Sequence, residues 1–370
     1  MKIARIEHIL VRVPYRHGGP YPVIGGQAWN AMDTLLLRVE TDDGAVGWGE
    51  AFGYNAIPAT IAALQSVVAP LCVGQDIGDL RRADIARLNF LVQQQLQNFG
   101  RTGPMIFALS GIDIALWDIA GQAAGQPLYK LLGAAGTVDR VPVYASLLRY
   151  GDPPLVAENA ARAVAQGYRH IKLHEIAEPM AAAARGAIGP DVALMVDANC
   201  PHTMDGALAM ARGFEPHGLM WLEEPLWPPE DWAGLARIGR EAGIAIAAGE
   251  NASTLADFRH MLEHRAVSYA QPSVTKIGGL TGLLEVLQLA QARSVAVAPH
   301  SPYFGPGLIA SIHVVAAQGD PMLVERFFCD LEASPHHDAI VARDGTMAVP
   351  QTPGLGVAVD QDVIARYRIN

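Results

Sequence analysis

The sequence predicts an α/β protein in which a β/α barrel follows an α+β segment. From Val141 onward, short apolar runs alternate with Ala-rich segments of helical spacing, as expected for βαβ units with a parallel sheet. The runs end in polar or ionisable residues spaced 23 to 27 positions apart: Lys172, Asp197, Glu223, Glu250, Ser273, His300 and Glu325. One βα unit of a closed barrel takes roughly 30 residues, and polar strand ends are typical of a barrel's active-site rim.

The first part of the chain has a different texture. Residues 1–50 contain alternating, strand-like runs around the turn signal Asp42–Asp43–Gly44, and residues 56–134 have helical spacing. We expect an α+β domain over residues 1–134. Its Gly- and Pro-rich stretch, residues 16–29, predicts a long loop, and long loops in compact domains are usually functional.

The chain ends in a segment without the barrel period. We assign residues 140–328 to the barrel and expect residues 329–370 to return to the N-terminal domain.

Composition excludes several classes of protein. With 51% hydrophobic residues in 370, the chain can bury a large core and is not disordered. Its formal net charge of −10 argues against a nucleic-acid partner. We see no signal peptide, and no apolar run reaches membrane-spanning length without charges or Gly and Pro. Three isolated cysteines, Cys72, Cys200 and Cys329, favour a cytoplasmic location.

Three acids at successive strand ends form a candidate metal site. Asp197, Glu223 and Glu250 would repel one another at such proximity unless a cation neutralised them. Oxygen-only ligands indicate Mg²⁺, with Mn²⁺ as the alternative. Asn199 lies two residues after Asp197 and is a candidate to orient a ligand or a substrate oxygen. Geometry alone does not choose between Glu223 and its neighbour Glu224.

Candidate proton-transfer groups surround these acids. Lys172 and His174 share one face of a strand, and His300 ends a later strand across the ring. Lys276 lies nearer a loop, with a structural ion pair as the alternative role. A metal ion that takes up enediolate charge, together with a nearby base, makes removal of a proton beside a carboxylate feasible. The same combination is a known pattern of enolase-superfamily sites.

Together the motifs resemble those of the mandelate racemase/muconate lactonizing enzyme family of the enolase superfamily, over essentially the whole chain. They are GAVGWGEA at 44–51, IDIALWDIAGQAAGQPLYKLLGA at 112–134, then KLH, VDAN, WLEEP, AGEN, TKIGG and PHS, and finally PGLGVAVD at 353–360.

The resemblance implies an N-terminal capping domain with a mobile substrate loop, near residues 16–29, over a modified (β/α)7β barrel. It implies that Asp197, Glu223 and Glu250 bind Mg²⁺, with Glu223 chosen over Glu224. His300 falls on the catalytic histidine of the racemase-like subgroup and Glu325 on its late-barrel acid. The resemblance also suggests a homo-oligomer.

Two positions depart from the family pattern. His174 stands where a second lysine is common, and Ser273 stands where an Asp that pairs with the histidine, or a Lys, is common. His300 therefore lacks its usual carboxylate partner. A racemase needs two competent bases, whereas dehydration needs one base and an acid for the leaving hydroxide.

We therefore expect dehydration of a sugar acid, a hydroxy-carboxylic acid, to a 2-keto-3-deoxy acid. The alternatives are a racemase or epimerase of a hydroxy or amino acid and a catalytically silent metal-binding barrel. A Schiff-base aldolase using Lys172 is disfavoured by the three acids. For substrate contacts we expect Arg16 and Tyr21 from the N-terminal loop, with Asn199, Lys276 and Glu325 from the barrel.

Overall fold

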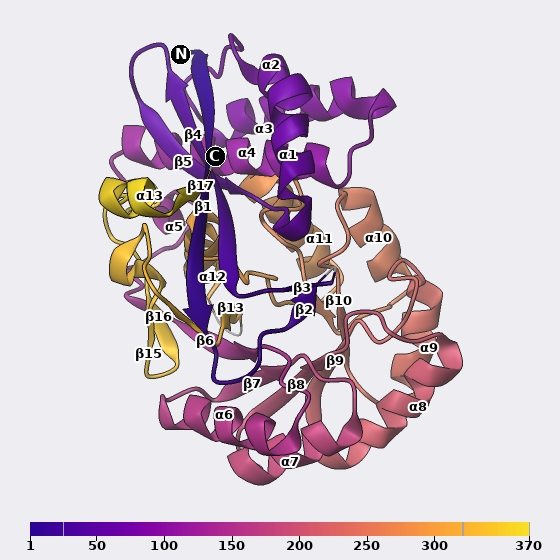
Figure 1. Ribbon diagram of the computed structural model, residues 1–370. Coiled ribbons are helices and arrows are strands. Elements are labelled where there is room, and N and C mark those ends of the chain that lie inside the picture. The colour runs from indigo at the N-terminus through magenta and orange to yellow at the C-terminus, as the bar shows by residue number, and fades with distance from the viewer. Residues whose placement is uncertain (25, 320–321, 370) are drawn as a thin grey trace.

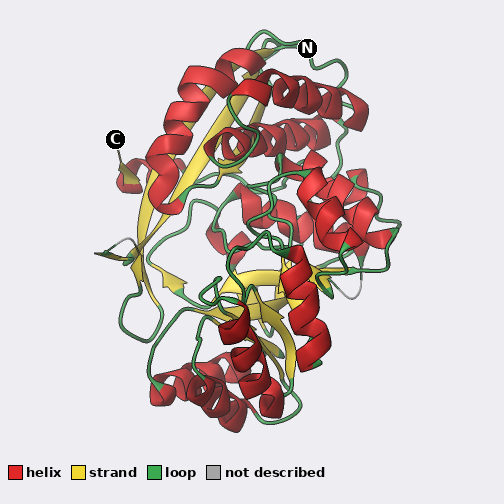
Figure 2. Ribbon diagram, turned by 90° about the vertical axis from the view of Figure 1, so that its right-hand side faces the viewer, coloured by secondary structure: helices red, strands yellow, loops and turns green. Residues whose placement is uncertain are grey.

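The computed structural model describes residues 1–24, 26–319 and 322–369. It contains an antiparallel sheet with flanking helices and, below it in Figure 1, a parallel barrel. Figure 2, a view from the side, shows the long strands of the first sheet with helices packed against them and the shorter barrel strands lower in the molecule.

Three long strands build the antiparallel sheet: β1 (Ile3–Arg16), β4 (Ala31–Thr41) and β5 (Val46–Ala51). In the second half of β1 the side chains alternate between interior and solvent, since Val11, Val13 and Tyr15 are buried and the residues between them are exposed. Val11 and Val13 belong to a small core with Leu36 and Ile364, on the opposite face of the sheet from Leu35 and Leu37, which belong to the main core.

The helices of the N-terminal part are α1 (Ile57–Ala63), α2 (Ala69–Cys72), α3 (Arg82–Gln95), α4 (Pro104–Ala123) and α5 (Leu128–Leu131), with a π-helical turn over Leu64–Val68. Of these helices, α4 packs directly on the antiparallel sheet, α1, α3 and α5 pack on α4, and α2 packs on α3. Helix α4 crosses β5 at very close range. A Cβ atom at Gly49 would lie 1.8 Å from the carbonyl oxygen of Gly111 on α4, so only glycine permits this approach.

Eight parallel strands form the barrel. They are β6 (Arg140–Leu147), β7 (His170–Leu173), β8 (Ala193–Asp197), β9 (Leu219–Glu223), β10 (Ile246–Ala248), β11 (Tyr269–Ala270), β12 (Ala296–Val297) and β13 (Val324–Phe327). Neighbours along the chain pair with each other, and β13 returns to pair with β6. Between β12 and β13, the contact is made by Ser301, whose backbone N–H and hydroxyl bond Glu325.

A helix links each pair of successive barrel strands in the described part of the chain. These helices are α6 (Pro153–Ala165), α7 (Glu178–Ile188), α8 (Met204–Phe214), α9 (Trp232–Ala242), α10 (Leu255–Glu263), α11 (Gly279–Gln291) and α12 (Pro306–Gln318). The order is strand–helix seven times and then a final strand. The predicted fold class, a (β/α)7β barrel with an α+β N-terminal part, is confirmed.

The last segment returns to the first sheet. Strands β14 (Asp330–Leu331) and β17 (Arg368–Ile369) pair with β1, and α13 (Gln361–Tyr367) packs beside it. Figure 1 shows this yellow segment alongside the indigo strand β1. The hairpin of β15 (Ala342–Arg343) and β16 (Thr346–Ala348) pairs instead with β6.

The stretch expected to be a long loop carries a short hairpin, β2 (Val23–Ile24) with β3 (Gln27–Ala28). Its base is held to the barrel, because the carbonyl oxygen of His17 accepts hydrogen bonds from the hydroxyl of Tyr150 and from Arg162. The hydroxyl of Tyr21 donates to the carbonyl of Tyr15 at 2.9 Å.

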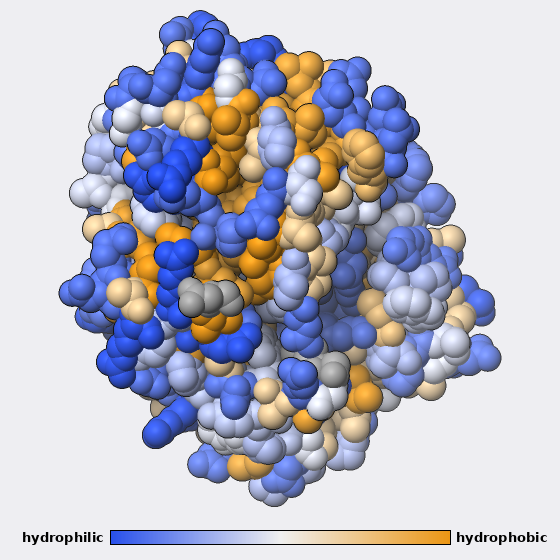
Figure 3. All heavy atoms as spheres, turned by 45° about the horizontal axis from the view of Figure 1, so that its top comes forward, coloured by the Kyte–Doolittle hydropathy of each residue, from blue (hydrophilic) through white to orange (hydrophobic). Residues whose placement is uncertain are grey.

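Apolar residues also reach the surface. On the face in Figure 3, hydrophilic residues surround a central hydrophobic area. By length and composition, two helical stretches, Tyr54–Cys72 and Pro104–Ala123, could cross a membrane. The second is 83% buried in the protein, so its apolar composition is explained by its place in the core.

Candidate active site

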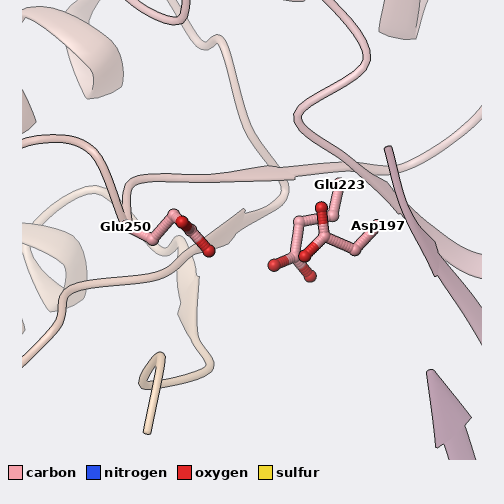
Figure 4. A group of neighbouring side chains, drawn as sticks. All are labelled: Asp197, Glu223 and Glu250. Atoms are coloured by element: carbon pink, nitrogen blue, oxygen red, sulfur yellow. The ribbon is translucent and has the colours of Figure 1, made fainter. Parts of the chain in front are cut away.

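Three carboxylates meet at the C-terminal ends of the barrel strands (Figure 4). Asp197 and Glu223 are the last residues of β8 and β9, and they are Cα partners in the pairing of these strands. Glu250 follows β10 by two residues. One oxygen atom from each residue lies within 4.8 Å of the other two. The structure therefore brings together the three acids that the strand-end pattern placed at one rim.

Lys172 lies fully buried among the acids. Its Nζ atom is 2.9 Å from Glu223 Oε1, 2.8 Å from Glu325 Oε1 and 3.5 Å from Asp197 Oδ2. Burial lowers the pKa of Lys172, but these carboxylates outweigh it and hold that pKa well above the ordinary value. The structure thus places Lys172 as a counter-charge to three acids, and its expected part in proton transfer stays a prediction.

Negative charge exceeds positive charge in this cluster. When all are ionised, four carboxylates face two lysine ammonium groups and leave two negative charges over: Asp197, Glu223, Glu250 and Glu325 against Lys172 and Lys276. Burial, followed by the charge of Asp197, raises the pKa of Glu223 well above its ordinary value. A divalent cation would balance the excess.

The donor set also fits Mg²⁺. The ion takes oxygen ligands at about 2.1 Å in octahedral geometry, so ligand oxygens on one ion lie about 3 to 4 Å apart. One oxygen atom from each of the three acids lies within 4.8 Å of the other two, which is close to this spacing. Asp197, Glu223 and Glu250 are therefore the residues that could hold the ion.

His174 has a defined proton position. Its Nδ1 atom lies 2.7 Å from the carbonyl oxygen of Leu147, and a carbonyl can only accept, so Nδ1 carries the proton. In the neutral ring the lone pair is then on Nε2, which lies 3.3 Å from Asp197 Oδ2 at the edge of the carboxylate cluster. This is the arrangement that a general base needs.

His300 approaches from the other side of the barrel mouth. Its Nε2 atom lies 3.0 Å from Glu250 Oε2. Its Nδ1 atom lies 3.1 Å from the Ser273 hydroxyl and 3.3 Å from the Tyr303 hydroxyl, which also contact each other. The carboxylate partner that sequence comparison with the family suggests is thus replaced by two hydroxyl groups.

Asn199 and Glu325 both line the site cavity, but their polar atoms already contact other groups of the protein. The backbone and side-chain N–H groups of Asn199 both donate to Asp197 Oδ1 at 2.9 Å, so Asn199 orients this acid. Glu325 accepts from the Ser146 hydroxyl at 2.7 Å and pairs with Lys172.

The other expected substrate contacts divide into two groups. Tyr21 lines the cavity. Lys276 is buried behind the site, 3.7 Å from Glu250 and over the ring of Phe52, which fits the structural ion pair considered as its alternative role. Arg16 lies exposed at the end of β1, paired with β14 and outside the residues that line the cavity, so the structure does not bring it into the site.

A cavity of about 580 Å³ lies over these groups. Its floor carries His174, Asp197, Glu250, His300 and Glu325, and its walls include residues of the N-terminal part: Pro20, Tyr21, Pro22, Val23, Trp29 and Tyr54. The cavity is therefore formed jointly by barrel strand ends and the stretch that follows β1. Such a volume suits a small molecule.

Sequence reasoning missed two hydroxyl groups of the site. Tyr303 supports His300, and Tyr54 lines the cavity with a backbone φ of +41°, an unusual value for a bulky residue. Burial, then the charges of Tyr303 and Glu250, raise the pKa of Tyr54 well above its ordinary value, so its phenol remains a donor. The aromatic FGYN run at 52–55 was the available signal for Tyr54.

Comparison with known families gives two matches. Residues 6–133 match the mandelate racemase / muconate lactonizing enzyme N-terminal domain, and residues 155–363 match the enolase C-terminal domain-like family. The two matches together take in most of the chain.

Individual relatives agree with these matches. The chain is 32% identical over 356 residues to an arabinonate dehydratase of Saccharolobus solfataricus, with 93% of each chain covered. It is 33% identical over 350 residues to a 3,6-anhydro-α-L-galactonate cycloisomerase of Streptomyces coelicolor, covering 91% of this chain and 92% of the relative.

A solved structure extends the likeness to three dimensions. L-Talarate dehydratase from Polaromonas sp. JS666, complexed with Mg and L-glucarate, aligns with a TM-score of 0.83 and 28% identity over 100% of this chain and 98% of that one. The sequence matches cover more than nine-tenths of the chain, and the shared fold covers all of it. The chain therefore belongs to the mandelate racemase/muconate lactonizing enzyme family of the enolase superfamily.

Proposed function

We propose that this protein is a Mg²⁺-dependent dehydratase that converts a sugar acid to a 2-keto-3-deoxy acid. The observation that carries the proposal concerns two histidines. The Nε2 atom of each one lies against a different acid of the same carboxylate cluster. His174 reaches Asp197 at 3.3 Å and His300 reaches Glu250 at 3.0 Å. A substrate carboxylate held at this cluster would present its carbon chain to both imidazoles.

Asp197, Glu223 and Glu250 would hold the ion, which when bound would stabilise negative charge on the substrate carboxylate during proton removal. Lys172 neutralises the acids from below, and Asn199 fixes the orientation of Asp197. The site would thereby hold the reacting end of the substrate in one position, and such positioning by itself lowers the activation barrier of the reaction.

His174 would take the α-proton on Nε2, since Nδ1 already carries a proton shared with the Leu147 carbonyl. His300 would deliver a proton to the β-hydroxyl, which leaves as water as the Cα–Cβ double bond forms. The resulting enol then tautomerises to the 2-keto-3-deoxy acid. One proton is removed and one is supplied, so the steps balance.

The relatives support the reaction class. Arabinonate dehydratase at 32% identity and D-gluconate dehydratase of Thermoproteus tenax at 31% are named for sugar-acid dehydration. A second candidate is cycloisomerisation, because the relative at 33% identity bears that name. Racemisation or epimerisation remains the third, since His300 stands on the side opposite His174.

The test is an assay of a library of acid sugars for 2-keto acid formation in the presence of Mg²⁺, with NMR in D₂O run in parallel. We expect keto acid from at least one sugar acid. Deuterium at the α-carbon of unconsumed substrate without keto acid would indicate a racemase or epimerase instead. Tight Mg²⁺ binding with no exchange on any acid would indicate a silent barrel.

We further propose that the protein acts in the cytoplasm as a homo-oligomer, on a small molecule and without a nucleic-acid or membrane partner. The cysteines Cys72, Cys200 and Cys329 are all free thiols, as a reducing compartment maintains them. The net charge of −10 is unfavourable for contact with phosphate backbones.

A further inference from the structure

Arg149 provides a positive charge at the cavity wall that the mechanism does not use. It lies two residues after β6 and lines the cavity. Its Nε atom donates to the carbonyl oxygen of His174 at 2.6 Å. Its two Nη groups have no partner within the part of the chain that the structure describes.

The groups around Arg149 do not neutralise it. Asp152, three residues along the chain, forms no ion pair with it, and Glu175 is buried and accepts from the backbone N–H groups of Tyr150 at 2.6 Å and Gly151 at 3.0 Å. The acids that line the cavity, Asp197, Glu250 and Glu325, belong to the carboxylate cluster or border Lys172. At one end of the cavity, the carboxylate cluster can hold a cation and the substrate group bound to it. The wall at Arg149 carries a guanidinium group with no ion-pair partner among the described residues.

The hydrogen bond to His174 fixes how far apart these two ends lie. The guanidinium is attached to the backbone of the residue whose imidazole reaches Asp197 at 3.3 Å. The separation between Arg149 and the cluster is therefore set by the length of one histidine residue. A sugar-acid chain of five or six carbons is of comparable length.

We propose that Arg149 binds a second carboxylate at the far end of the substrate, so that the preferred substrates are dicarboxylic sugar acids. A planar guanidinium with free N–H groups matches the two oxygens of a carboxylate. The inference rests on the proposed function, because it assumes that the first carboxylate lies at the Asp197–Glu223–Glu250 cluster. It adds to that function the class of acid that the site selects.

The test compares matched acids that differ only at the far end: glucarate with gluconate, and galactarate with galactonate. Binding to the Mg²⁺-loaded protein is measured by calorimetry, and kcat/KM replaces it for any acid that turns over. We expect the wild type to favour the diacids, and Arg149→Met to weaken diacid binding by roughly 10- to 100-fold more than it weakens monoacid binding. Arg149→Lys should keep part of the preference, because the charge remains and the fork is lost.

The control is Arg169→Met, which removes the same charge from an exposed arginine just before the start of β7, at the opposite end of the barrel. It should not change the preference. Equal affinity of the wild type for both members of each pair would overturn the inference. So would an equal loss for diacids and monoacids in Arg149→Met, because that result would mean that Arg149 only positions His174.

The two proposals fail in different ways. Diacid binding that depends on Arg149, with no α-proton exchange and no keto acid, would support this inference and contradict the dehydratase. Dehydration of monoacids with no response to a second carboxylate would support the dehydratase and contradict this inference.

Discussion

His174 and His300 differ in what holds their Nδ1 atoms, and this difference assigns their roles. A backbone carbonyl can only accept, so it keeps the proton of His174 on Nδ1 and leaves Nε2 as an acceptor. The hydroxyl groups of Ser273 and Tyr303 can accept or donate, so they support either proton position of His300. With Nδ1 protonated and donating to one of these hydroxyl groups, His300 can give up a proton from Nε2 and become the neutral ring.

Replacing each histidine by glutamine should separate the two steps. His174→Gln removes the base, and we expect both α-deuterium exchange and keto acid formation to fall by about 10²- to 10⁴-fold. His300→Gln removes the acid, so keto acid formation should fall by a similar factor while exchange at the α-carbon persists. NMR in D₂O measures both on the same sample.

Two results would contradict this assignment. Exchange that survives in His174→Gln and disappears in His300→Gln would reverse the roles. Loss of exchange in both variants, with circular dichroism unchanged, would mean that the proton is shared between the imidazoles as in a racemase.

The residues that sequence placed correctly are those whose position follows from strand ends. Asp197 and Glu223 end paired strands, so their proximity follows from the barrel period alone. Tyr54 and Tyr303 lie in connecting segments, and their contacts depend on how the N-terminal part meets the barrel, which the sequence pattern does not encode. The role of Lys172 depends on distances to three acids, and no spacing rule gives such distances.

At the scale of elements, the contact of α4 with β5 depends on glycine. Gly49 faces the backbone of α4, where a Cβ atom would lie 1.8 Å from Gly111 O. We expect Gly49→Ala to lower the free energy of unfolding by about 2 to 3 kcal/mol, because the helix must move away. Urea denaturation measures this change.

The matched control is Gly186→Ala on α7, where an added Cβ meets no atom within 4 Å. Alanine has the higher helix propensity, so this variant should be more stable than the wild type by about 0.5 to 1 kcal/mol. Equal effects of the two substitutions would contradict the packing argument.

Helix α12 joins the C-terminal segment through a buried histidine. His313 Nδ1 lies 3.2 Å from the backbone N–H of Tyr129, and its Nε2 lies 3.1 Å from the carbonyl oxygen of Leu355. Burial lowers the pKa of His313 from 6.5 to about 4. The unfolded chain therefore binds a proton more readily than the folded one between these values, and stability falls as the pH drops from 6.5 toward 4.

This predicts a contribution of His313 to the pH dependence of stability that a substitution can isolate. The shift corresponds to a loss of about 3 kcal/mol between pH 6.5 and 4. His313→Gln cannot be protonated, so its free energy of unfolding should fall less than that of the wild type over this range. His260→Gln, at an exposed position on α10, serves as the control. Parallel curves for wild type and His313→Gln would contradict the prediction.

The elements themselves were predictable to different degrees. The helices and longer strands follow from periodicity, because burial of one face imposes it. Strands β11 and β12 span two residues each, too few to show a period. The hairpin of β2 and β3 was expected as a loop, since its Gly- and Pro-rich sequence gives no alternation.

At the scale of the whole molecule, the N-terminal part and the barrel complete one site. The cavity takes its floor from the barrel and part of its wall from Pro20, Tyr21 and Trp29. The family resemblance led to this expectation, whereas hydrophobic patterning assigned the two parts separately. We propose that the boundaries near residues 134–140 and 328–329 separate structural domains, and that neither domain forms the active site without the other.

The excess negative charge of the carboxylate cluster makes stability depend on a divalent cation. An ion that binds only the folded chain stabilises it by about 2.7 kcal/mol at 100 times the dissociation constant, and for a chain of this length that raises Tm by about 3 °C. We expect Mg²⁺ to produce this shift and a chelator to reverse it. Sodium chloride at equal ionic strength should not, because the cluster is buried and poorly screened.

Glu223→Gln removes a carboxylate of the cluster and should abolish the shift. Glu224→Gln should retain it, because Glu224 turns away to accept from Cys200 and Asn251. A Mg²⁺ response lost in Glu224→Gln and kept in Glu223→Gln would reverse the choice between these neighbours, and a response kept in both would place the ion elsewhere.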